Sequence, residues 1–275
     1  MLRDGIITKI NSDTYTVRVN NSFYACKARG KFRNDKVKPF VGDNVKVDLG
    51  TLVISEVLER KNFLLRPPVA NIDIALIVTS IVKPNLSLNL LDKLISIIRI
   101  NKIEPVIVLT KLDLCTKNDL IEVKKLVKYY ESIGIKVFTN KKIRRLKKYL
   151  KNKIVTVCGQ TGAGKSTLLN KFDKHLYLNT DEISEALGRG KHTTRIVELF
   201  QIDKFSIVDT PGFSSIDIDI YSEEEIRNSF QEFSKYTCKF KDCKHLNEMG
   251  CSIKNNENIL SSRYENYKKF LGELK

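Results

Sequence analysis

The sequence predicts an α/β domain that lies between a small N-terminal β-barrel and a C-terminal helical region. Three observations support this fold class. Short alternating strand patterns fill residues 1–62, apolar strands alternate with helical periods from residue 72 onward, and three cysteines and a histidine gather near the C-terminus. At about 150 residues per domain, a chain of 275 residues has room for two domains and a third small one.

Composition limits the class of protein. With 42% hydrophobic residues and only 13 Gly and 6 Pro, the chain is neither disordered nor collagen-like. No apolar run approaches the ~20 residues that cross a bilayer, and the start, MLRDGIITKINSD, lacks the apolar stretch of a signal peptide, so we expect a cytoplasmic protein. The net charge of +16 favours a polyanionic partner, either nucleic acid or an anionic membrane surface.

The N-terminal part contains five short strand patterns separated by turn residues. They lie at residues 5–10, 14–19, 23–32, 44–49 and 52–58. Five strands at this spacing suit a small closed barrel, and an OB-fold is the commonest five-stranded candidate. An SH3-like barrel would leave much the same pattern.

The middle of the chain alternates strands and helices. Strand patterns occupy residues 72–80, 105–110, 135–138, 153–158, 196–202 and 205–209. Helices are expected between them, one with Leu90, Leu91, Leu94, Ile97 and Ile98 on one face, one from a Thr116–Asp119 capping box to about residue 131, and one after Lys165. Such crossovers predict a largely parallel sheet that is covered on both faces. A second capping box, Ser222–Glu225, begins the C-terminal helices, the last near residues 262–274.

The clearest motif is a complete G-x-x-x-x-G-K-S between a predicted strand and a predicted helix. It reads Gly159-Gln160-Thr161-Gly162-Ala163-Gly164-Lys165-Ser166, and Thr167 extends the predicted nucleotide site. Backbone N–H groups of such a loop cradle the β-phosphate, the lysine reaches the β/γ oxygens and the serine hydroxyl ligates Mg²⁺. The loop does not reveal the base, because ATPases, kinases and GTPases share it.

Two further motifs follow strands at the edge where α/β sheets bind ligands. In Asp209-Thr210-Pro211-Gly212, the acid is placed to hold Mg²⁺ through water, while the backbone at Gly212 senses the γ-phosphate. In Thr110-Lys111-Leu112-Asp113, the carboxylate is able to accept both the N1–H and the N2–H of guanine, donors that adenine lacks. The Lys111 stem is able to lie against the base.

The C-terminal motif is Cys238-x4-Cys243-x-His245-x5-Cys251. Three thiolates and an imidazole at short loop spacing match a closed tetrahedral zinc site. A full ligand set leaves no open position for an activated water, so the sequence predicts one structural Zn²⁺.

Residues 124–153 hold twelve Lys or Arg and a single acid, Glu131. A solvated helical face is the ordinary meaning of such a run. On a protein of this charge it favours contact with a polyanion, which phosphate neutralisation would make salt-dependent. A membrane-surface helix is disfavoured, because the apolar stripe of this segment is short.

The set and order of these motifs resemble a known class. The P-loop, DTPG and TKLD resemble the motifs of translation-factor-like GTPases, but TKLD precedes the P-loop, as in a circularly permuted GTPase. With a barrel in front and a Cys/His cluster behind, the chain resembles the ribosome small-subunit-dependent GTPase A family, often called RsgA. It also carries a segment that looks like that family's switch I, Gly188-Arg189-Gly190-Lys191-His192-Thr193-Thr194. The resemblance implies that Thr193 or Thr194 closes on Mg²⁺ and the γ-phosphate, and it assigns the four Cys/His residues to zinc.

The chain departs from the expected motifs at two places and from small signalling GTPases at a third. Thr110 stands where the family has Asn, so we expect modest guanine affinity, and Phe138-Thr139-Asn140 replaces a Ser-Ala pair, which leaves the contact to guanine O6 unassigned. Phe213 stands where small signalling GTPases carry a water-orienting Gln, so intrinsic hydrolysis should be slow. His192 is our candidate to accept a hydrogen bond from the attacking water, with a solvated loop histidine as the alternative.

We therefore expect an OB-like barrel over residues 1–64, a circularly permuted P-loop GTPase domain over 65–218 and a zinc-binding helical domain over 219–275. The resemblance implies a GTP hydrolase that uses GTP/GDP and Mg²⁺, binds rRNA in a nucleotide-dependent way and acts in late maturation of the small (30S) ribosomal subunit. We expect a monomer without a membrane partner. Two alternatives are a P-loop ATPase or kinase acting on a small molecule, and an RNA-binding module with a regulatory nucleotide site.

Overall fold

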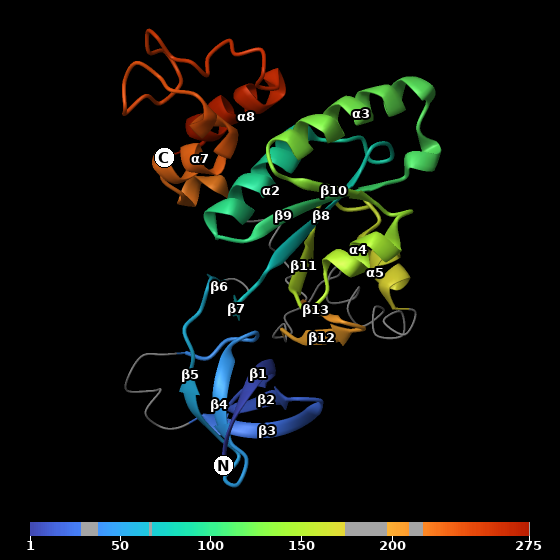
Figure 1. Ribbon diagram of the computed structural model, residues 1–275, viewed down its shortest axis with the longest axis vertical. Helices are drawn as coiled ribbons and strands as arrows, with labels where there is room; N and C mark the ends of the chain where they lie inside the picture. The colour runs from blue at the N-terminus through green and yellow to red at the C-terminus, as the bar shows by residue number, and fades with distance from the viewer. Residues whose placement is uncertain (29–37, 66–67, 174–196, 209–216, 275) are drawn as a thin grey trace. The chain divides into compact units, whose positions relative to one another are not determined.

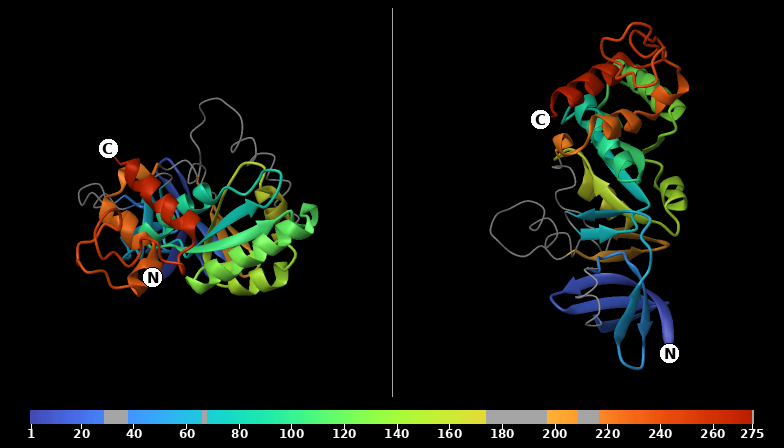
Figure 2. Two further views of the ribbon diagram at one scale, coloured as in Figure 1. Left: turned by 90° about the horizontal axis from the view of Figure 1, so that it is seen from above. Right: turned by 90° about the vertical axis from the view of Figure 1, so that its left-hand side faces the viewer.

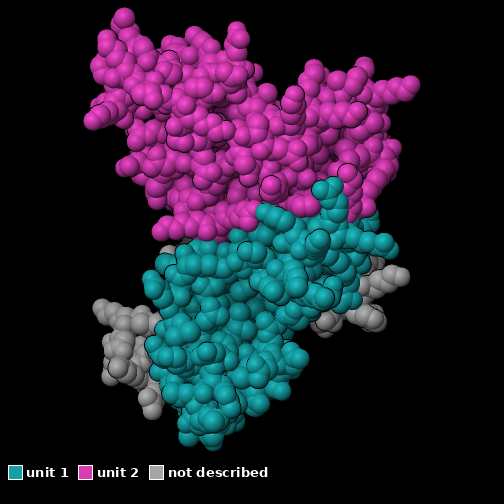
Figure 3. Space-filling view, viewed as in Figure 1, with its two compact units in different colours: residues 1–75, 143–157, 166–213 teal, residues 76–142, 158–165, 214–275 magenta. Residues whose placement is uncertain are grey.

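The computed structural model describes residues 1–28, 38–65, 68–173, 197–208 and 217–274 (Figure 1). The chain forms two compact units, each built from segments far apart in the sequence (Figure 3). Unit 1 comprises residues 1–75, 143–157 and 166–213, and unit 2 comprises residues 76–142, 158–165 and 214–275. Among the described helices, none has the length and apolar character to span a membrane.

Unit 1 begins with a closed five-stranded barrel, which the right-hand view of Figure 2 shows in blue. Its strands are β1 Leu2–Asn11, β2 Thr14–Val19, β3 Ser22–Ala28, β4 Asn44–Asp48 and β5 Val53–Val57. The order is β1-β2-β3-β5-β4, β1 pairs with β4 to close the barrel, and β3 runs parallel to β5. The alternating side chains pack inside, with Ile7, Val17, Cys26, Val45 and Ile54 fully buried. The predicted N-terminal barrel is confirmed.

The chain leaves the barrel through a segment held by a buried ion pair. Arg60 donates from Nε and Nη2 to the two carboxylate oxygens of Asp43, both at 2.7 Å, and the Asp43 side chain is fully buried. The Arg60 guanidinium also lies 4.2 Å from the centre of the Phe40 ring. A short hairpin follows, β6 Phe63–Leu65 and β7 Pro68–Ala70, which the strand patterns of the sequence do not predict.

The central sheet has six strands. Most of β8 Ile74–Ser80 belongs to unit 2, where β9 Glu104–Thr110 lies beside it and β10 Lys136–Thr139 is outermost. Unit 1 contributes, in this order, β11 Ile154–Cys158, β13 Phe205–Val208 and β12 Leu199–Ile202. β10 is parallel to β9 and β11 to β13, as predicted. β12 is antiparallel to β13, because only Asp203 and Lys204 connect them, and a connection of two residues reverses the chain. The sheet is therefore mixed.

Two helices of unit 2 begin at the capping boxes that the sequence predicts, and a third begins at a cap that was not predicted. In α2 Leu88–Ile100, Ser87 caps the N-terminus, and Leu91, Leu94, Ile97 and Ile98 are buried as predicted. Each such side chain stabilises the fold by about 1.5–3 kcal/mol on burial. The capping box before α3 Lys117–Ser132 has both of its hydrogen bonds, as does the one at Ser222. Unit 1 holds α4 Ile143–Tyr149 and most of α5 Lys165–Phe172.

The C-terminal region of unit 2 packs on α2 (Figure 1). It contains η3 Ile218–Ile220, α7 Glu223–Ser229, η4 Gln231–Lys235 and α8 Ser261–Gly272. Phe230, Phe233, Tyr267 and Phe270 form its aromatic core.

A charged cluster is buried between these helices and α2. The guanidinium of Arg263 on α8, with no exposed surface, donates to Asp92 of α2 at 2.8 Å and to Glu232 of η4 at 2.8 Å. Asp92 also accepts hydrogen bonds from Tyr130 at 2.8 Å and from Asn266 at 2.7 Å. Because breaking one partner of a buried pair costs about 3–5 kcal/mol, this cluster fixes the position of the C-terminal helices on α2.

Candidate nucleotide and metal sites

The P-loop connects β11 to α5, as the motif requires. Gly159 and Gly164 have φ angles of +128° and +93°, in the region that favours glycine. A Cβ atom on Gly159 would lie 2.1 Å from the carbonyl oxygen of Val78, so only glycine fits there. The loop therefore runs from a strand into a helix N-terminus, the arrangement that binds phosphate through backbone N–H groups.

Lys165 is the charged group of this loop. It is partly buried, and its ammonium donates hydrogen bonds to the carbonyl oxygens of Gly159 at 2.8 Å and Gln160 at 2.9 Å. Burial lowers the pKa of Lys165 below its ordinary value. Burial raises the pKa of the neighbouring Cys158 thiol to about 12, so this thiol is neutral at physiological pH. Ser166, the predicted Mg²⁺ ligand, is exposed at the start of α5.

Thr110 joins the predicted base-reading segment to the P-loop. It is the last residue of β9 and is 2% exposed. Its Oγ1 lies 2.6 Å from the carbonyl oxygen of Ala163 and 3.3 Å from that of Thr79. A hydroxyl has one hydrogen to donate, and the shorter contact takes it. Strand β9 is thereby tied to a loop 53 residues further along the chain.

The residues after Thr110 turn sharply. Lys111 has a φ of +57°, and Asp113 lies exposed in the short helix η1 Leu112–Leu114. The Lys111 ammonium donates to the carbonyl oxygen of Lys83, in the loop that follows β8. Pro84 in the same loop comes within 3.6 Å of the place where Gly162 would carry a Cβ. The β8 loop is therefore bonded to the TKLD segment and lies beside the P-loop.

Lys83 and Pro84 were missed by our sequence reasoning. A signal was present, since both follow the end of a strand at the edge where α/β sheets place ligand contacts. The remaining motifs fall in residues 174–196 and 209–216, outside the described residues. They comprise the switch I-like segment with His192, Thr193 and Thr194, and Asp209, Gly212 and Phe213. The described part of β13 ends at Val208, directly before Asp209, and pairs in register with β11 (Thr156 with Val208).

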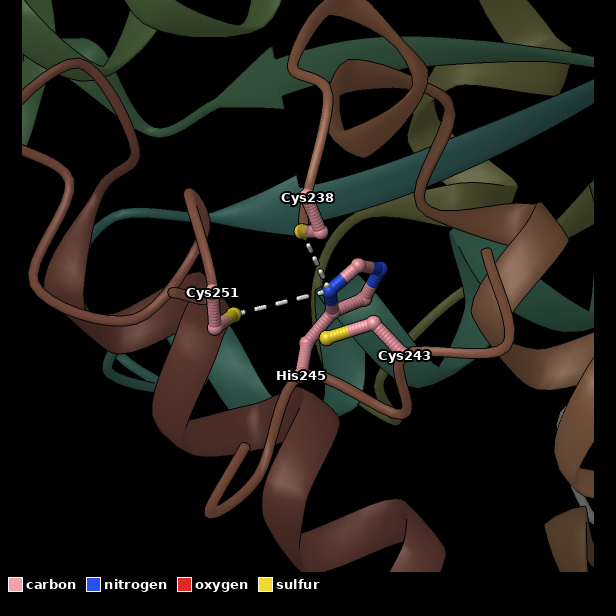
Figure 4. A group of neighbouring side chains, drawn as sticks. All are labelled: Cys238, Cys243, His245 and Cys251. Carbon is pink, nitrogen blue, oxygen red and sulfur yellow. Dashed lines mark hydrogen bonds between the residues drawn. The ribbon is translucent and has the colours of Figure 1, made fainter. Parts of the chain in front are cut away.

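The four predicted metal ligands come together in the C-terminal region (Figure 4). The donor atoms of Cys238, Cys243, His245 and Cys251 all lie within 4.8 Å of one another. His245 Nδ1 is 3.5 Å from the sulfur of Cys238 and 3.6 Å from that of Cys251. Around a tetrahedral zinc, with bonds of ~2.3 Å to sulfur and ~2.0 Å to nitrogen, such atoms lie about 3.5 Å apart. The donor set and its spacing therefore fit a zinc ion.

The surroundings of the cluster support thiolate ligands. The backbone N–H of Ser252 donates to the sulfur of Cys238 at 3.3 Å, and that of Lys254 donates to Cys251 at 3.4 Å. Burial lowers the pKa of His245, with a further contribution from the charge of Arg227, so its ring is neutral at physiological pH. Without a metal, burial raises the pKa of the Cys243 thiol to about 12, so binding of a metal displaces a proton from it.

The geometry defines a class of protein. The P-loop lies between a strand and a helix and is tied by Thr110 to the predicted base-reading segment, which follows an earlier strand. This is therefore a P-loop nucleotide-binding protein with the motif order of a circularly permuted GTPase.

Comparisons with known proteins identify the family. The family model described as RsgA GTPase matches residues 57–219, and the RsgA N-terminal domain matches residues 4–51. The chain belongs to the RsgA GTPase family. A relative from Enterococcus faecalis, called small ribosomal subunit biogenesis GTPase RsgA, is 42% identical over 98% of this chain and 95% of its own length. A Clostridium perfringens protein of that name is 40% identical over 98% of both chains.

Solved structures agree with this assignment. The crystal structure of YjeQ from Thermotoga maritima has a TM-score of 0.87 and 36% identity, covering 100% of this chain and 99% of the other. The structure of YloQ, described as a circularly permuted GTPase, has a TM-score of 0.85 and 30% identity, covering 100% and 95%. The predicted fold class, family and GTPase activity are confirmed.

Proposed function

We propose that this protein hydrolyses GTP during late maturation of the small ribosomal subunit and binds rRNA in a nucleotide-dependent way. The observation that carries the proposal is the hydrogen bond from Thr110 to Ala163, which joins the guanine-reading segment to the P-loop. The names of the E. faecalis and C. perfringens relatives support the ribosomal role. The protein acts as a monomer in the cytoplasm, and its functional domains are residues 1–64, 65–218 and 219–275.

The P-loop holds the nucleotide through its backbone. Residues 159–167 bind the phosphates, with Lys165 on the β/γ oxygens, where its charge stabilises the negative charge that grows during hydrolysis. A Mg²⁺ ion, when bound, supplies further positive charge at these oxygens, and Ser166 and Asp209 would hold it. Thr193 or Thr194 closes over the γ-phosphate, Gly212 senses its presence, and His192 accepts a hydrogen bond from the attacking water.

Base selection rests on Asp113 and Lys111. The exposed Asp113 carboxylate pairs with the two guanine donors, and the Lys111 stem, directed by the bond to Lys83, lies along the base. Thr110 acts as a positioning residue, because its hydroxyl is engaged with the P-loop carbonyl rather than with solvent.

The Cys/His cluster holds one structural zinc. Three cysteines and His245 complete a tetrahedral set, so no ligand position remains for chemistry. The ion holds together a loop-rich stretch that has little apolar material of its own.

Helix α4 supplies a basic surface for rRNA. Leu146 and Leu150 are fully buried, so the apolar side of this segment packs inside the protein and is not free to enter a membrane. Arg144, Arg145 and Lys148 are exposed on the other sides. Phosphate contacts of this kind make affinity fall as salt rises.

Two measurements test the proposal. Titration of isolated 30S subunits against GTP turnover should show stimulation over the slow intrinsic rate, and an absence of stimulation would contradict the ribosomal role. GDP should raise the melting temperature more than ADP does. A larger shift with ADP would favour a P-loop ATPase or kinase acting on a small molecule.

A further inference from the structure

A hollow of about 440 Å³ opens in the C-terminal region beside the Cys/His cluster. Its walls come from α7, η4 and the loop that carries Cys238 and Cys243. Cys238, Cys243 and His245 line part of it, but a single metal ion fills only a small fraction of such a volume. The remaining space falls in the range of pockets that hold small organic ligands, about 300–1,000 Å³.

The lining of the hollow carries positive charge. Arg227 and Lys241 line it, and its lining residues include no carboxylate. Arg227 donates one N–H to the carbonyl oxygen of Cys243 at a long 3.4 Å, which leaves most of the five donors of a guanidinium for other partners. Of the nearby acids, Glu223 is paired with Lys244 at 2.6 Å, and Glu248 accepts hydrogen bonds from the backbone N–H groups of Lys244 and Leu246. Neither of these acids nor Asp242 lines the hollow. Cys238 and Cys243 also line the hollow as zinc thiolates, and a Zn²⁺ ion with three thiolates and a neutral histidine has a net charge of −1. The two cations exceed this charge, so the hollow favours an anionic ligand.

The same walls offer groups that suit a flat heteroaromatic ring. Phe240 is 46% exposed, although large apolar rings are ordinarily covered, and the partly buried Tyr236 also lines the hollow. The side-chain amides of Asn228 and Gln231 each combine donors with an acceptor, as the polar edge of a nucleobase does. Exposed aromatic rings, amides and cations are the groups with which proteins bind unpaired nucleotides.

We propose that this hollow binds one unpaired nucleotide of single-stranded RNA, with its base stacked on Phe240 and its phosphate beside Lys241 and Arg227. The inference rests on the proposed rRNA-binding function and assigns a particular contact to the C-terminal region. The amides of Asn228 and Gln231 select among bases, and the absence of carboxylate from the lining disfavours a basic peptide as occupant.

The test uses the full-length, zinc-loaded protein and a single-stranded RNA of about eight nucleotides that carries one 2-aminopurine. Stacking quenches the fluorescence of this base, while anisotropy reports overall affinity. Phe240→Ala should lower affinity about tenfold and abolish the quenching, and Phe240→Tyr should keep both. Met249→Ala is the matched control, because Met249 is an apolar residue of the same loop that is 83% exposed and does not line the hollow.

A second pair of variants tests the phosphate contact. Lys241→Ala should reduce the dependence of RNA affinity on salt by about one released counterion, whereas Lys254→Ala, which removes an exposed lysine outside the hollow, should not. If Phe240→Ala and Met249→Ala bind RNA equally and quench equally, the proposal is wrong. It is also wrong if Phe240→Ala weakens binding to 30S subunits while leaving RNA binding unchanged, since the occupant is then a protein side chain.

The outcome separates this inference from the proposed function. If 30S subunits stimulate GTP turnover by the wild-type protein but Phe240→Ala binds and quenches the RNA as Met249→Ala does, only the proposal for the hollow is overturned. Absence of stimulation in the wild-type protein would overturn the ribosomal role itself.

Discussion

The metal cluster and the nucleotide site differ in how they are assembled. All four metal ligands lie within a stretch of 14 residues, from Cys238 to Cys251. The nucleotide site joins the loop after β8, the end of β9 and the P-loop, through contacts that span 28 and 53 residues. The spacing of residues in the sequence is enough to predict the metal cluster, and the cluster depends on its metal. The nucleotide site depends on the tertiary fold. Variants of each site should therefore leave the other intact.

The largest effect is expected at the attacking water. His192→Ala should leave GTP affinity and 30S binding nearly unchanged and reduce the stimulated rate about 10²- to 10⁴-fold, the effect of losing a general base. Single-turnover GTP hydrolysis with saturating 30S subunits measures this rate. A rate within about twofold of wild type would mean that backbone groups or rRNA position the water.

Loss of the P-loop charge should come next. Lys165→Ala should reduce GTP turnover about 10²- to 10³-fold, because the ammonium no longer stabilises charge on the transferred phosphoryl group. Elemental analysis of the same protein should still find one zinc per chain. Wild-type turnover, or loss of zinc, would contradict the separation of the two sites.

Asp113→Asn should change base preference. The amide presents a donor to position 2 of xanthine, so affinity for GDP should fall at least about tenfold while that for XDP rises. Isothermal titration with both nucleotides measures the two affinities. Equal affinities in mutant and wild-type protein would remove Asp113 from base recognition.

The metal site should respond to pH. Thiols must lose their protons to bind zinc, so apparent zinc affinity should weaken by about tenfold per pH unit for each proton displaced as pH falls. Competition with a chromogenic chelator at several pH values measures this slope, and GDP affinity serves as the control. Zinc affinity independent of pH would mean that the cysteines are not the ligands.

The smallest effect is expected at the link between β9 and the P-loop. Thr110→Val removes the hydroxyl but keeps the shape, and the loss of one hydrogen bond should lower GDP affinity about fivefold. Thr110→Ser should stay near wild type, because it keeps the donor to Ala163. If valine and serine behave alike, the hydroxyl does not position the loop.

The sequence predicts features whose determinants are local. The capping boxes at Thr116 and Ser222, the P-loop glycines and the Cys/His spacing all lie within a few residues, and the described structure contains them as expected. The hairpin β6–β7 was missed because strands of three residues carry too little periodicity.

Contacts between distant residues could not be predicted from spacing. The bond from Lys111 to Lys83 and the pair Arg263–Asp92 join residues 28 and 171 positions apart, and no local pattern connects them. The antiparallel orientation of β12 was missed for another reason. Alternation of strands and helices predicts a parallel sheet, but β12 and β13 are joined by two residues, which is too short for a parallel crossover.

The buried cluster around Arg263 limits how the protein can be divided. Removal of α8 would take away Arg263 and Asn266, which both donate hydrogen bonds to Asp92, and would uncover the apolar surface of α2 around this carboxylate. Helix α2 would then carry an unpaired charge on the surface that the C-terminal helices now cover. The C-terminal helices are thus an integral part of unit 2, and gene fragments that end before α8 should yield unstable protein.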